Sequence, residues 1–192
     1  MPKYRESGMP SEDIWEGFYE PEKILKQLQV NKHVNTLIDV GCGYGTFLLP
    51  ASRMISGTAI GIDIDGEMVE SCRKKAVTEG LNNIVAIQGD ISDDSTNSIL
   101  KNYSGSIDYI SLFNILHCEH PVSLLKATYS LLNSDGMIGV IHWKREDTPR
   151  GPSMAIRPTP EQIIQWANEA KYVMDVQVDL KPYHFGLVFV KR

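Results

Sequence analysis

Short apolar runs alternate regularly with longer helical patterns along this chain, and this alternation leaves few folds open. The apolar runs are rich in β-branched residues and lie at Thr36–Val40, Thr58–Asp63, Ile84–Gln88, Ile107–Leu112 and Met137–His142. Continuous rather than alternating hydrophobicity is typical of strands in a parallel sheet that is covered on both faces. The pattern therefore predicts a doubly wound α/β fold.

The remaining segments complete this pattern. Helices are expected over Ser11–Phe18, Pro21–Gln29, Thr46–Ser56, Gly66–Gly80, Ser95–Tyr103, Val122–Leu132 and Pro160–Ala170. Asp65 and Thr159 are the expected N-caps of two of them. Two further strand patterns, Tyr172–Asp179 and His184–Lys191, are separated by only four residues. Because four residues are too few for a parallel crossover, these strands must form an antiparallel hairpin.

Length and composition indicate one globular domain over residues 1–192, with a helical lid at 1–31 and a loop rich in proline and arginine at 143–159. The fractions of hydrophobic (42%) and charged residues (22%) exclude a disordered or fibrous chain. The net charge of −5 argues against a nucleic-acid partner.

Nothing in the sequence predicts a membrane partner, and we expect a cytoplasmic location. The longest uncharged apolar-leaning stretch, Tyr109–Cys118, has ten residues, which is too short to cross a membrane. The first residues lack the apolar core of a signal peptide. The three cysteines, Cys42, Cys72 and Cys118, cannot all pair and lack metal-site spacing, so reduced thiols are expected.

A glycine-rich turn follows the first predicted strand and opens a helix. Residues 37–46 read LIDVGCGYGT, with glycines at 41, 43 and 45 that allow a tight turn and a close approach of a ligand to the backbone. Asp63 lies eighteen residues beyond Gly45, at the end of the second strand, where an acid faces the ribose hydroxyls of a bound nucleotide.

NAD-binding proteins carry similar loops, but three features favour another ligand. Thr46 stands where a dinucleotide-binding loop has its next glycine. Asp39 places a carboxylate near the loop, which suits a cation and disfavours a pyrophosphate. A chain of 192 residues also leaves no room for a separate substrate domain. These features point to a positively charged nucleoside without phosphate, such as S-adenosylmethionine.

The motifs resemble those of the class I S-adenosylmethionine-dependent methyltransferases over roughly residues 34–142. Asp39–Gly45 is similar to the first motif of that family, Gly61–Asp65 to the second, Gly89–Ile91 to the third and Ile107–His117 to the fourth. The resemblance implies a seven-stranded Rossmann-like sheet that ends in an antiparallel hairpin. It also implies that Asp63 binds the ribose and that Asp90 receives the adenine amino group. The cofactor-binding residues expected on this basis are Asp39, Gly41, Cys42, Gly43, Gly45, Asp63, Ile64, Asp90, Ile91 and Asn114.

The sequence departs from the family pattern at three places. Leu132–Gly136 replaces the usual Leu-x-Pro-Gly-Gly turn, and Asp65 replaces the commoner serine after the ribose acid. The fourth strand is followed by Asn-Ile-Leu rather than by the Pro-Pro-Tyr element of methyltransferases that act on the amino groups of bases. This last departure makes a base-methylating enzyme a less favoured interpretation.

Candidates for the chemistry follow the fourth and fifth strands. A general base is needed only if the methyl acceptor must lose a proton. His117 and His142 are the candidates for this role or for binding the acceptor; the alternative is that they hydrogen-bond to loop backbone. No metal site is expected, because neighbouring side chains in His117–His120 point in different directions.

Several other residues are candidates for the acceptor side. Arg150 and Arg157 could fork a carboxylate or phosphate of the acceptor, although charges in loops are more often solvated. Trp143 and Tyr183 are expected to border the acceptor cavity. Trp15, Phe18 and Tyr19 share one helical face and could form a lid or dock the N-terminal segment. The basic run Arg73–Lys75 is expected to be a solvated helix face.

The sequence thus predicts methyl transfer from S-adenosylmethionine to a small-molecule acceptor. The alternatives are a protein or nucleic-acid methyltransferase, a nicotinamide-dependent reductase, and a catalytically silent protein that binds the cofactor. The sequence names neither the acceptor nor the oligomeric state.

Overall fold

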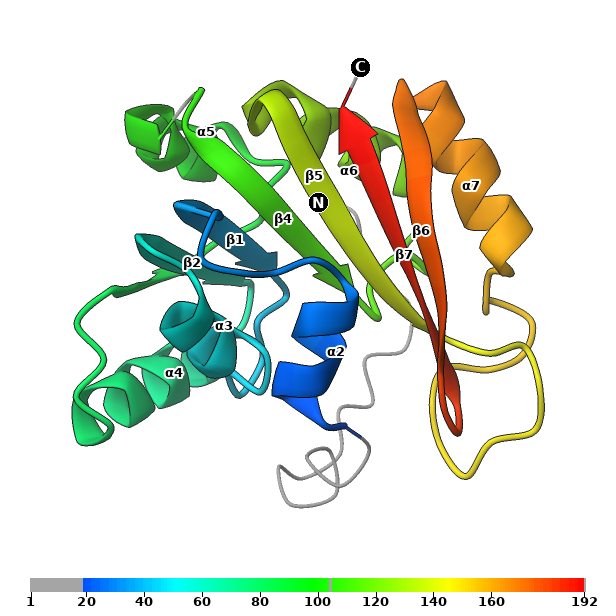
Figure 1. The fold of residues 1–192 in the computed structure, drawn as a ribbon, viewed down its shortest axis with the longest axis horizontal. Helices are drawn as coiled ribbons and strands as arrows, with labels where there is room; N and C mark the ends of the chain where they lie inside the picture. Colours follow the sequence, from blue (N-terminus) through cyan, green and yellow to red (C-terminus); the bar gives the residue numbers. More distant parts are fainter. Residues whose placement is uncertain (1–18, 104, 192) are drawn as a thin grey trace.

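A seven-stranded sheet with the strand order β3-β2-β1-β4-β5-β7-β6 forms the centre of the molecule (Figure 1). The computed structural model describes residues 19–103 and 105–191. The strands are β1 (Thr36–Val40), β2 (Thr58–Asp63), β3 (Ile84–Gln88), β4 (Ile107–Phe113), β5 (Leu132–Trp143), β6 (Tyr172–Leu180) and β7 (His184–Lys191). Strands β1 to β5 pair in parallel, and β7 runs antiparallel to both β5 and β6. The predicted fold class and C-terminal hairpin are therefore confirmed.

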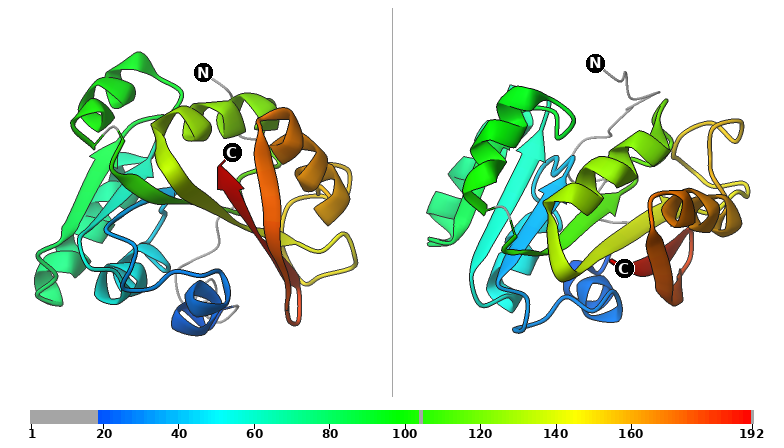
Figure 2. Two further views of the ribbon diagram at one scale, coloured as in Figure 1. Left: turned by 45° about the horizontal axis from the view of Figure 1, so that its top comes forward. Right: turned by 90° about the horizontal axis from the view of Figure 1, so that it is seen from above.

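Helices cover both faces of the sheet (Figure 2). One layer contains α2 (Pro21–Gln27), α3 (Leu48–Met54) and α4 (Gly66–Thr78), and the other contains α5 (Asp94–Leu100), α6 (Pro121–Leu131) and α7 (Pro160–Glu169). A short 3₁₀ turn, η1 (Lys101–Tyr103), follows α5. Within the described part of the chain, no helix combines the length and hydrophobicity needed to span a bilayer. The helix expected over Ser11–Phe18 lies outside the described residues.

Both expected N-caps are confirmed. The side chain of Asp65 accepts a hydrogen bond from Glu67 N at the start of α4. Thr159 and Gln162 form a reciprocal capping box at the start of α7, with Pro160 in the first turn.

The sheet has two buried faces, and this explains the continuous hydrophobicity of its strands. In β1, Ile38 packs with α5, α6 and α7, whereas its neighbour Leu37 packs with α2, α3 and α4. In β4, Ile110 packs on the face covered by α5, α6 and α7, and its neighbour Tyr109 packs on the opposite face. Successive side chains of a strand point to opposite faces, so a strand covered on both sides needs apolar residues throughout.

Two elements begin two or more residues away from the expected position. α3 begins at Leu48 rather than at Thr46, because residues 43–47 remain in turns. β5 begins at Leu132, directly after α6, rather than at Met137. Its register on β4 shifts between Leu132 and Met137, so residues 133–136 form a bulge. Turn-forming residues thus interrupt the strand without ending it.

The strand order changes direction between β1 and β4. From β1 the sheet grows through β2 and β3 on one side, and through β4 and β5 on the other. In open α/β sheets, ligands bind at such a point, in the crevice outside the carboxyl ends of the strands. The glycine-rich turn after β1 and the loop after β4 meet there.

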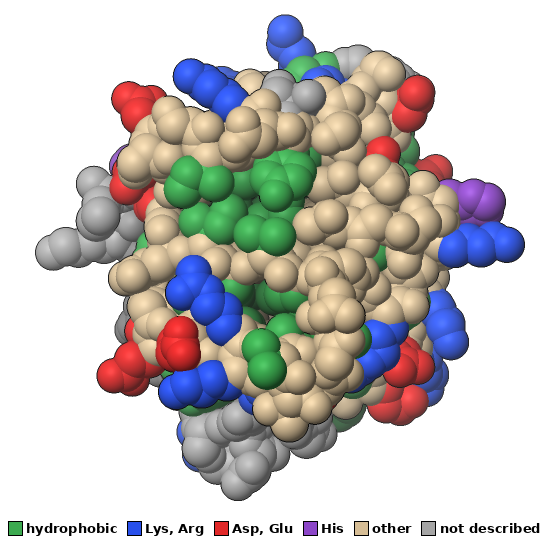
Figure 3. All heavy atoms as spheres, turned by 90° about the vertical axis from the view of Figure 1, so that its left-hand side faces the viewer, with side chains coloured by type: hydrophobic (Ala, Val, Ile, Leu, Met, Phe, Trp, Pro, Cys, Tyr) green, Lys and Arg blue, Asp and Glu red, His purple; other side chains and the backbone are tan. Residues whose placement is uncertain are grey.

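β3 lies at the edge of the sheet that Figure 3 faces, where hydrophobic side chains gather near the centre of the view. Val85 of β3, Val77 of α4 and Ile99 of α5 are exposed hydrophobic residues of these elements. The guanidinium of Arg73 donates to Ala86 O over 2.7 Å. A side chain of α4 therefore donates a hydrogen bond to one backbone carbonyl group of this edge strand.

Candidate active site

The glycine-rich turn is held against the neighbouring strands by backbone contacts. Gly41 N donates to Ile62 O of β2 over 2.7 Å. Both Gly41 (φ +72°) and Gly45 (φ +84°) have left-handed backbone conformations that favour glycine. A Cβ atom at Gly45 would lie 2.2 Å from Leu49 Cδ1, and one at Gly41 would lie 3.1 Å from Ile115 Cγ2. These glycines therefore allow the turn to pack closely on α3 and on the loop after β4.

Asp63 is anchored to this turn by one carboxylate oxygen and to its own loop by the other. Oδ2 accepts from Gly43 N and Oδ1 accepts from Asp65 N, each over 2.9 Å. A carboxylate oxygen can accept more than one hydrogen bond, so Asp63 keeps acceptor capacity for hydroxyl groups of a ligand. The next side chain, Ile64, is 54% exposed, which leaves a large apolar surface uncovered beside the carboxylate.

Asp39 is a buried carboxylate at the end of β1, with 4% of its surface exposed. The pKa of Asp39 is raised to about 7, mainly by burial; a hydrogen bond donated by Ser111 Oγ opposes the increase, and the negative charge of Asp63 contributes to it. A cation bound nearby would favour the charged carboxylate. The site therefore contains a negative group that a positively charged ligand would stabilise.

The substitution Asp39→Asn should remove a pH dependence of stability. The pKa of Asp39 is about 7 in the folded chain and about 3.9 in an unfolded one. Between these values only the native state holds the proton, so the contribution of Asp39 lowers the free energy of unfolding as pH rises. Urea unfolding should show that the free energy of unfolding of the variant, relative to that of the wild type, rises by about 2–4 kcal/mol between pH 4 and 8. Asp94→Asn, at an exposed acid, is the control; parallel pH profiles for wild type and Asp39→Asn would contradict the assignment.

The other predicted cofactor residues lie around the same crevice. Asp90 is buried after β3, and its Oδ1 accepts from Ser92 N over 2.8 Å; Ile91 beside it is fully buried. Cys42 Sγ and Cys72 Sγ are 3.9 Å apart, and Cys72 also donates to Gly43 O. The two thiols thus fill the space beneath the turn.

The basic run Arg73–Lys75 of α4 was expected to be a solvated helix face. Two of its side chains instead donate hydrogen bonds to backbone carbonyl groups. Lys75 Nζ donates to Tyr44 O in the glycine-rich turn over 2.9 Å. Arg73 donates to Ala86 O, as described above. The pattern of charges showed these residues on one helix, but the carbonyl groups that they reach become neighbours only in the folded chain.

Asn114 connects the loop after β4 to two distant segments. Its backbone N donates to Ile141 O, and its φ of +56° turns the chain sharply after β4. Its side-chain Nδ2 donates to the hydroxyl of Tyr19 over 2.8 Å, and that hydroxyl lies 2.8 Å from His184 Nε2. The amide oxygen Oδ1 is buried and has no hydrogen-bond partner.

The sequence did not reveal this network. The sequence pattern places His184 only at the start of a strand, and Tyr19 only on an aromatic face of a helix. The other two aromatic residues of that face, Trp15 and Phe18, lie outside the described residues. Nothing local in the sequence links residues 19, 114 and 184.

His117 and His142, predicted as catalytic candidates, lie side by side. Their rings are nearly perpendicular, with centroids 5.5 Å apart. His142 is completely buried; its Nδ1 lies 3.3 Å from Trp143 O, and its Nε2 has no hydrogen-bond partner. The pKa of His142 is lowered to about 3, mainly by burial and next by the neighbouring His117; the hydrogen bond to Trp143 O opposes the decrease, and His184 and Arg157 contribute to it. His142 is therefore neutral at physiological pH.

Arg157 organises the loop between β5 and α7. Its buried guanidinium donates to the backbone carbonyls of Lys144, Glu146, Arg150 and Pro152. It also lies over the ring of Trp143, with Cζ 5.6 Å from the centroid. Four of its five N–H donors are thus used within the loop, which leaves it a single donor where two are needed to fork an anionic group of the acceptor. Arg150, the other candidate, is exposed.

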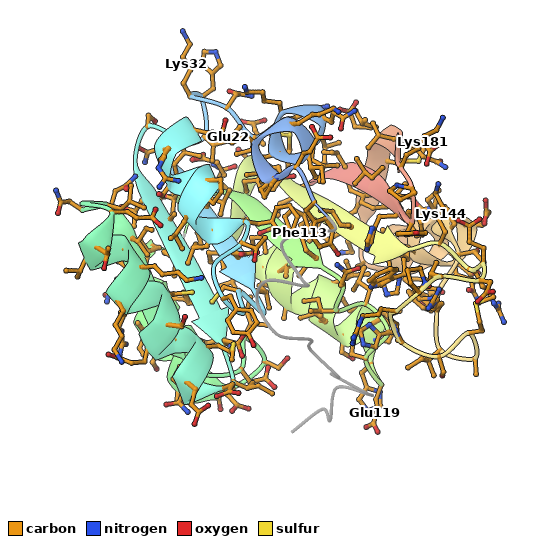
Figure 4. All side chains as sticks on the ribbon, turned by 90° about the horizontal axis from the view of Figure 1, so that it is seen from below. Glu22, Lys32, Phe113, Glu119, Lys144 and Lys181 are labelled. Carbon is orange, nitrogen blue, oxygen red and sulfur yellow. The ribbon has the colours of Figure 1, made fainter. Side chains whose placement is uncertain are left out.

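Trp143 and Tyr183 stack at the end of the β6–β7 hairpin, with ring centroids 6.3 Å apart. Trp143 is buried against His184 as well, so it supports the loop more than it borders an open cavity. Figure 4 views the molecule from the side on which β4 and β5 end; Phe113 lies near the middle, with Lys144 and Lys181 to one side. Lys144 pairs with Asp179 over 2.6 Å, and this ion pair joins the loop to the hairpin.

These features fit a nucleoside that carries a positive charge. An anchored carboxylate faces the glycine-rich turn, an apolar side chain lies uncovered beside it, and a bare amide oxygen lies on the other side of the turn. Among residues 19–103 and 105–191, no group of three or more histidine, cysteine or acidic side chains could hold a metal ion.

A family model described as a methyltransferase domain matches residues 31–180. The chain belongs to this methyltransferase domain family. The predicted class I S-adenosylmethionine-dependent type is thereby confirmed, and it agrees with the strand order and the hairpin.

Known proteins resemble this methyltransferase domain to different extents. A crystal structure of a SAM-dependent methyltransferase from Aquifex aeolicus has the same fold, with a TM-score of 0.81 and 22% identity over 94% of each chain. Nocamycin O-methyltransferase of Saccharothrix syringae is 33% identical over 107 residues, which is 54% of this chain and 36% of that protein. Ribosomal protein L11 methyltransferase of Clostridium botulinum is 34% identical over 62 residues, or 32% of this chain and 20% of that protein. The chain therefore matches only a minor part of these two relatives.

Proposed function

We propose that this chain transfers a methyl group from S-adenosylmethionine to a small-molecule acceptor. The observation that carries the proposal is the contact between His117 and the fully buried His142 at the ends of β4 and β5. Because His142 is fully buried and His117 only partly exposed, this position suits a compact acceptor better than a bulky one. The printed name of the relative from Saccharothrix, an O-methyltransferase of nocamycin, supports an acceptor of this kind.

The cofactor is assigned to the crevice between β1 and β4. When bound, S-adenosylmethionine supplies both the methyl group and its own leaving group. Asp63 would bind the ribose hydroxyls, and Asp90 the adenine amino group, with the exposed Ile64 against the ring. Ile91, also expected there, is a fully buried core residue and would only support Asp90 from behind. The backbone of residues 41–45 would approach the cofactor closely, and Asp39 and Asn114 would face its positively charged end.

His117 is assigned as the base that takes a proton from the acceptor, because it is half-buried rather than enclosed and lies in the loop after β4. His142 would assist as a neutral group. With Nδ1–H directed to Trp143 O, its Nε2 presents a lone pair. That lone pair can accept a hydrogen bond. It therefore favours an acceptor whose atom facing Nε2 carries an O–H or N–H hydrogen over one whose facing atom is an anion.

Replacing His117 by alanine should slow transfer more than it weakens cofactor binding. We expect kcat to fall about 100-fold, the usual scale for loss of a general base, and the Kd for S-adenosylhomocysteine to change less than threefold. Steady-state kinetics and calorimetry measure the two effects. His120→Ala, at an exposed histidine three residues further on, is the matched control; equal rates for His117→Ala and wild type would refute the role of His117.

The class of acceptor can be tested with radiolabelled S-adenosylmethionine. The purified chain is incubated with a cell extract that has been separated into low-mass, protein and RNA fractions. Label in the low-mass fraction is the expected result. Label in the protein fraction would instead support the second candidate, a protein methyltransferase, which the match to ribosomal protein L11 methyltransferase favours. Label in RNA, or in no fraction despite cofactor binding, would also overturn the proposal.

A further inference from the structure

The hydroxyl of Tyr19 joins three segments that are far apart in the sequence. It accepts from Asn114 Nδ2 after β4 and lies 2.8 Å from His184 Nε2 at the start of β7. The ring of Tyr19 packs on His184 and on Phe47, with centroid distances of 4.7 and 5.1 Å. Only 8% of the Tyr19 surface is exposed. The geometry of the hydroxyl is thus fixed from several sides.

The hydrogen bonds of this network have one consistent direction. An amide nitrogen only donates, so the oxygen of Tyr19 accepts from Asn114. The single hydrogen of the hydroxyl is then directed to His184 Nε2, which must carry a lone pair. Burial lowers the pKa of His184 to about 3, and the charges of Arg157 and Lys144 act in the same direction. The ring is therefore neutral, as this arrangement requires.

This direction determines which end of the Asn114 amide remains available. The amino group faces Tyr19, so Oδ1 faces away from it, buried and without a partner. A buried carbonyl oxygen that accepts nothing indicates a donor that is missing from the protein alone. Ile115, the next residue, packs against Gly41 of the glycine-rich turn, so Asn114 lies beside the crevice at the carboxyl ends of β1 and β4.

We propose that Tyr19 is a positioning residue that holds the bare oxygen of Asn114 as the acceptor for the ammonium group at the amino-acid end of the cofactor. The inference rests on the proposed use of S-adenosylmethionine. A cationic N–H donor suits this oxygen, because hydrogen bonds from charged donors are stronger than neutral ones and because the Asp39 carboxylate lies on the adjacent strand. His184 anchors the hydroxyl at the other end of the network.

The test compares two ligands that differ in the amino-acid end, which includes the ammonium group. S-adenosylhomocysteine carries it, whereas 5′-methylthioadenosine shares the adenosine and the sulfur but lacks the amino-acid end. Calorimetry of the full chain should show that Tyr19→Phe raises the Kd for S-adenosylhomocysteine about tenfold, as expected for a charged hydrogen bond. The Kd for 5′-methylthioadenosine should change less than twofold. Tyr129→Phe, which removes a hydroxyl from α6 in the core on the opposite face of the sheet, should change neither value.

A second background tests whether Tyr19 acts through Asn114. In Asn114→Gly, which suits the positive φ, the oxygen is absent, so adding Tyr19→Phe should change the Kd for S-adenosylhomocysteine less than twofold. Three results would overturn the proposal: an unchanged Kd in Tyr19→Phe, equal weakening of both ligands, or a full effect of Tyr19→Phe in Asn114→Gly. Thermal unfolding of each variant separates these effects from loss of fold. These binding measurements need no acceptor, so they are independent of the acceptor class.

Discussion

Asp63→Ala is expected to raise the dissociation constant for S-adenosylhomocysteine about 100-fold. The carboxylate now accepts from Gly43 N and Asp65 N and is assigned to the ribose as well. Its removal deletes charged hydrogen bonds to the ligand, each of which contributes about 1.5–3 kcal/mol. It also releases the turn that must approach the cofactor. Calorimetric titration of wild type and variant measures the change.

The matched control is Asp65→Ala, two residues along the same loop. Asp65 caps α4 through Glu67 N and does not bind the glycine-rich turn. Its removal should therefore lower the stability by about 1 kcal/mol but change the Kd less than threefold. Equal binding by Asp63→Ala and wild type would disprove the assignment of Asp63 to the ribose.

Arg157→Ala should destabilise the folded chain by about 3–5 kcal/mol, the range seen when a buried charged group is removed from its partners. The substitution leaves four carbonyl groups without their donor and removes the cation from the face of Trp143. For a chain of this size the melting temperature should fall by about 10 °C. Urea unfolding and thermal scans measure the two quantities.

Arg157→Lys and Arg150→Ala complete this test. A lysine presents a single ammonium and cannot reach four carbonyls in the geometry of a guanidinium, so it should recover less than half of the loss. Arg150 is exposed, and its replacement should change the stability by less than about 0.5 kcal/mol. If Arg157→Ala were as stable as wild type but bound an acceptor poorly, Arg157 would be a ligand-binding residue after all.

The parts of the fold that local sequence determines were predicted closely. Thr36–Val40, Thr58–Asp63 and Ile84–Gln88 have the expected bounds, because each is an apolar run enclosed by turn-forming residues. The start of β5 was missed because Asn133–Gly136 has the composition of a turn and forms a bulge within the strand. A pattern of residue types does not distinguish a turn that ends a strand from one that interrupts it.

In the candidate site, too, the contacts that local sequence determines could be predicted, and the contacts between distant segments could not. The turn at Gly41–Gly45 and its partner Asp63 could be predicted, because a fixed spacing in a βαβ unit brings them together. The role of Arg157 could not, since its partners are backbone carbonyls, which every residue carries. The contact between Tyr19 and His184 spans 165 positions and depends on the completed sheet. The assignments of His117 and His142 remain predictions, although the fold places the two rings in contact.

The position of β7 sets the order in which the molecule can be assembled during synthesis. β7 follows β6 in the chain but lies between β5 and β6, so β6 has no strand to pair with until β7 has emerged. Tyr19, translated early, must likewise wait for His184 before its hydroxyl is anchored. On a ribosome the glycine-rich turn can therefore form long before the network around Asn114. Binding of the nucleoside and full binding of the amino-acid end should consequently appear at different lengths of the nascent chain, the second once His184 at the start of β7 has emerged.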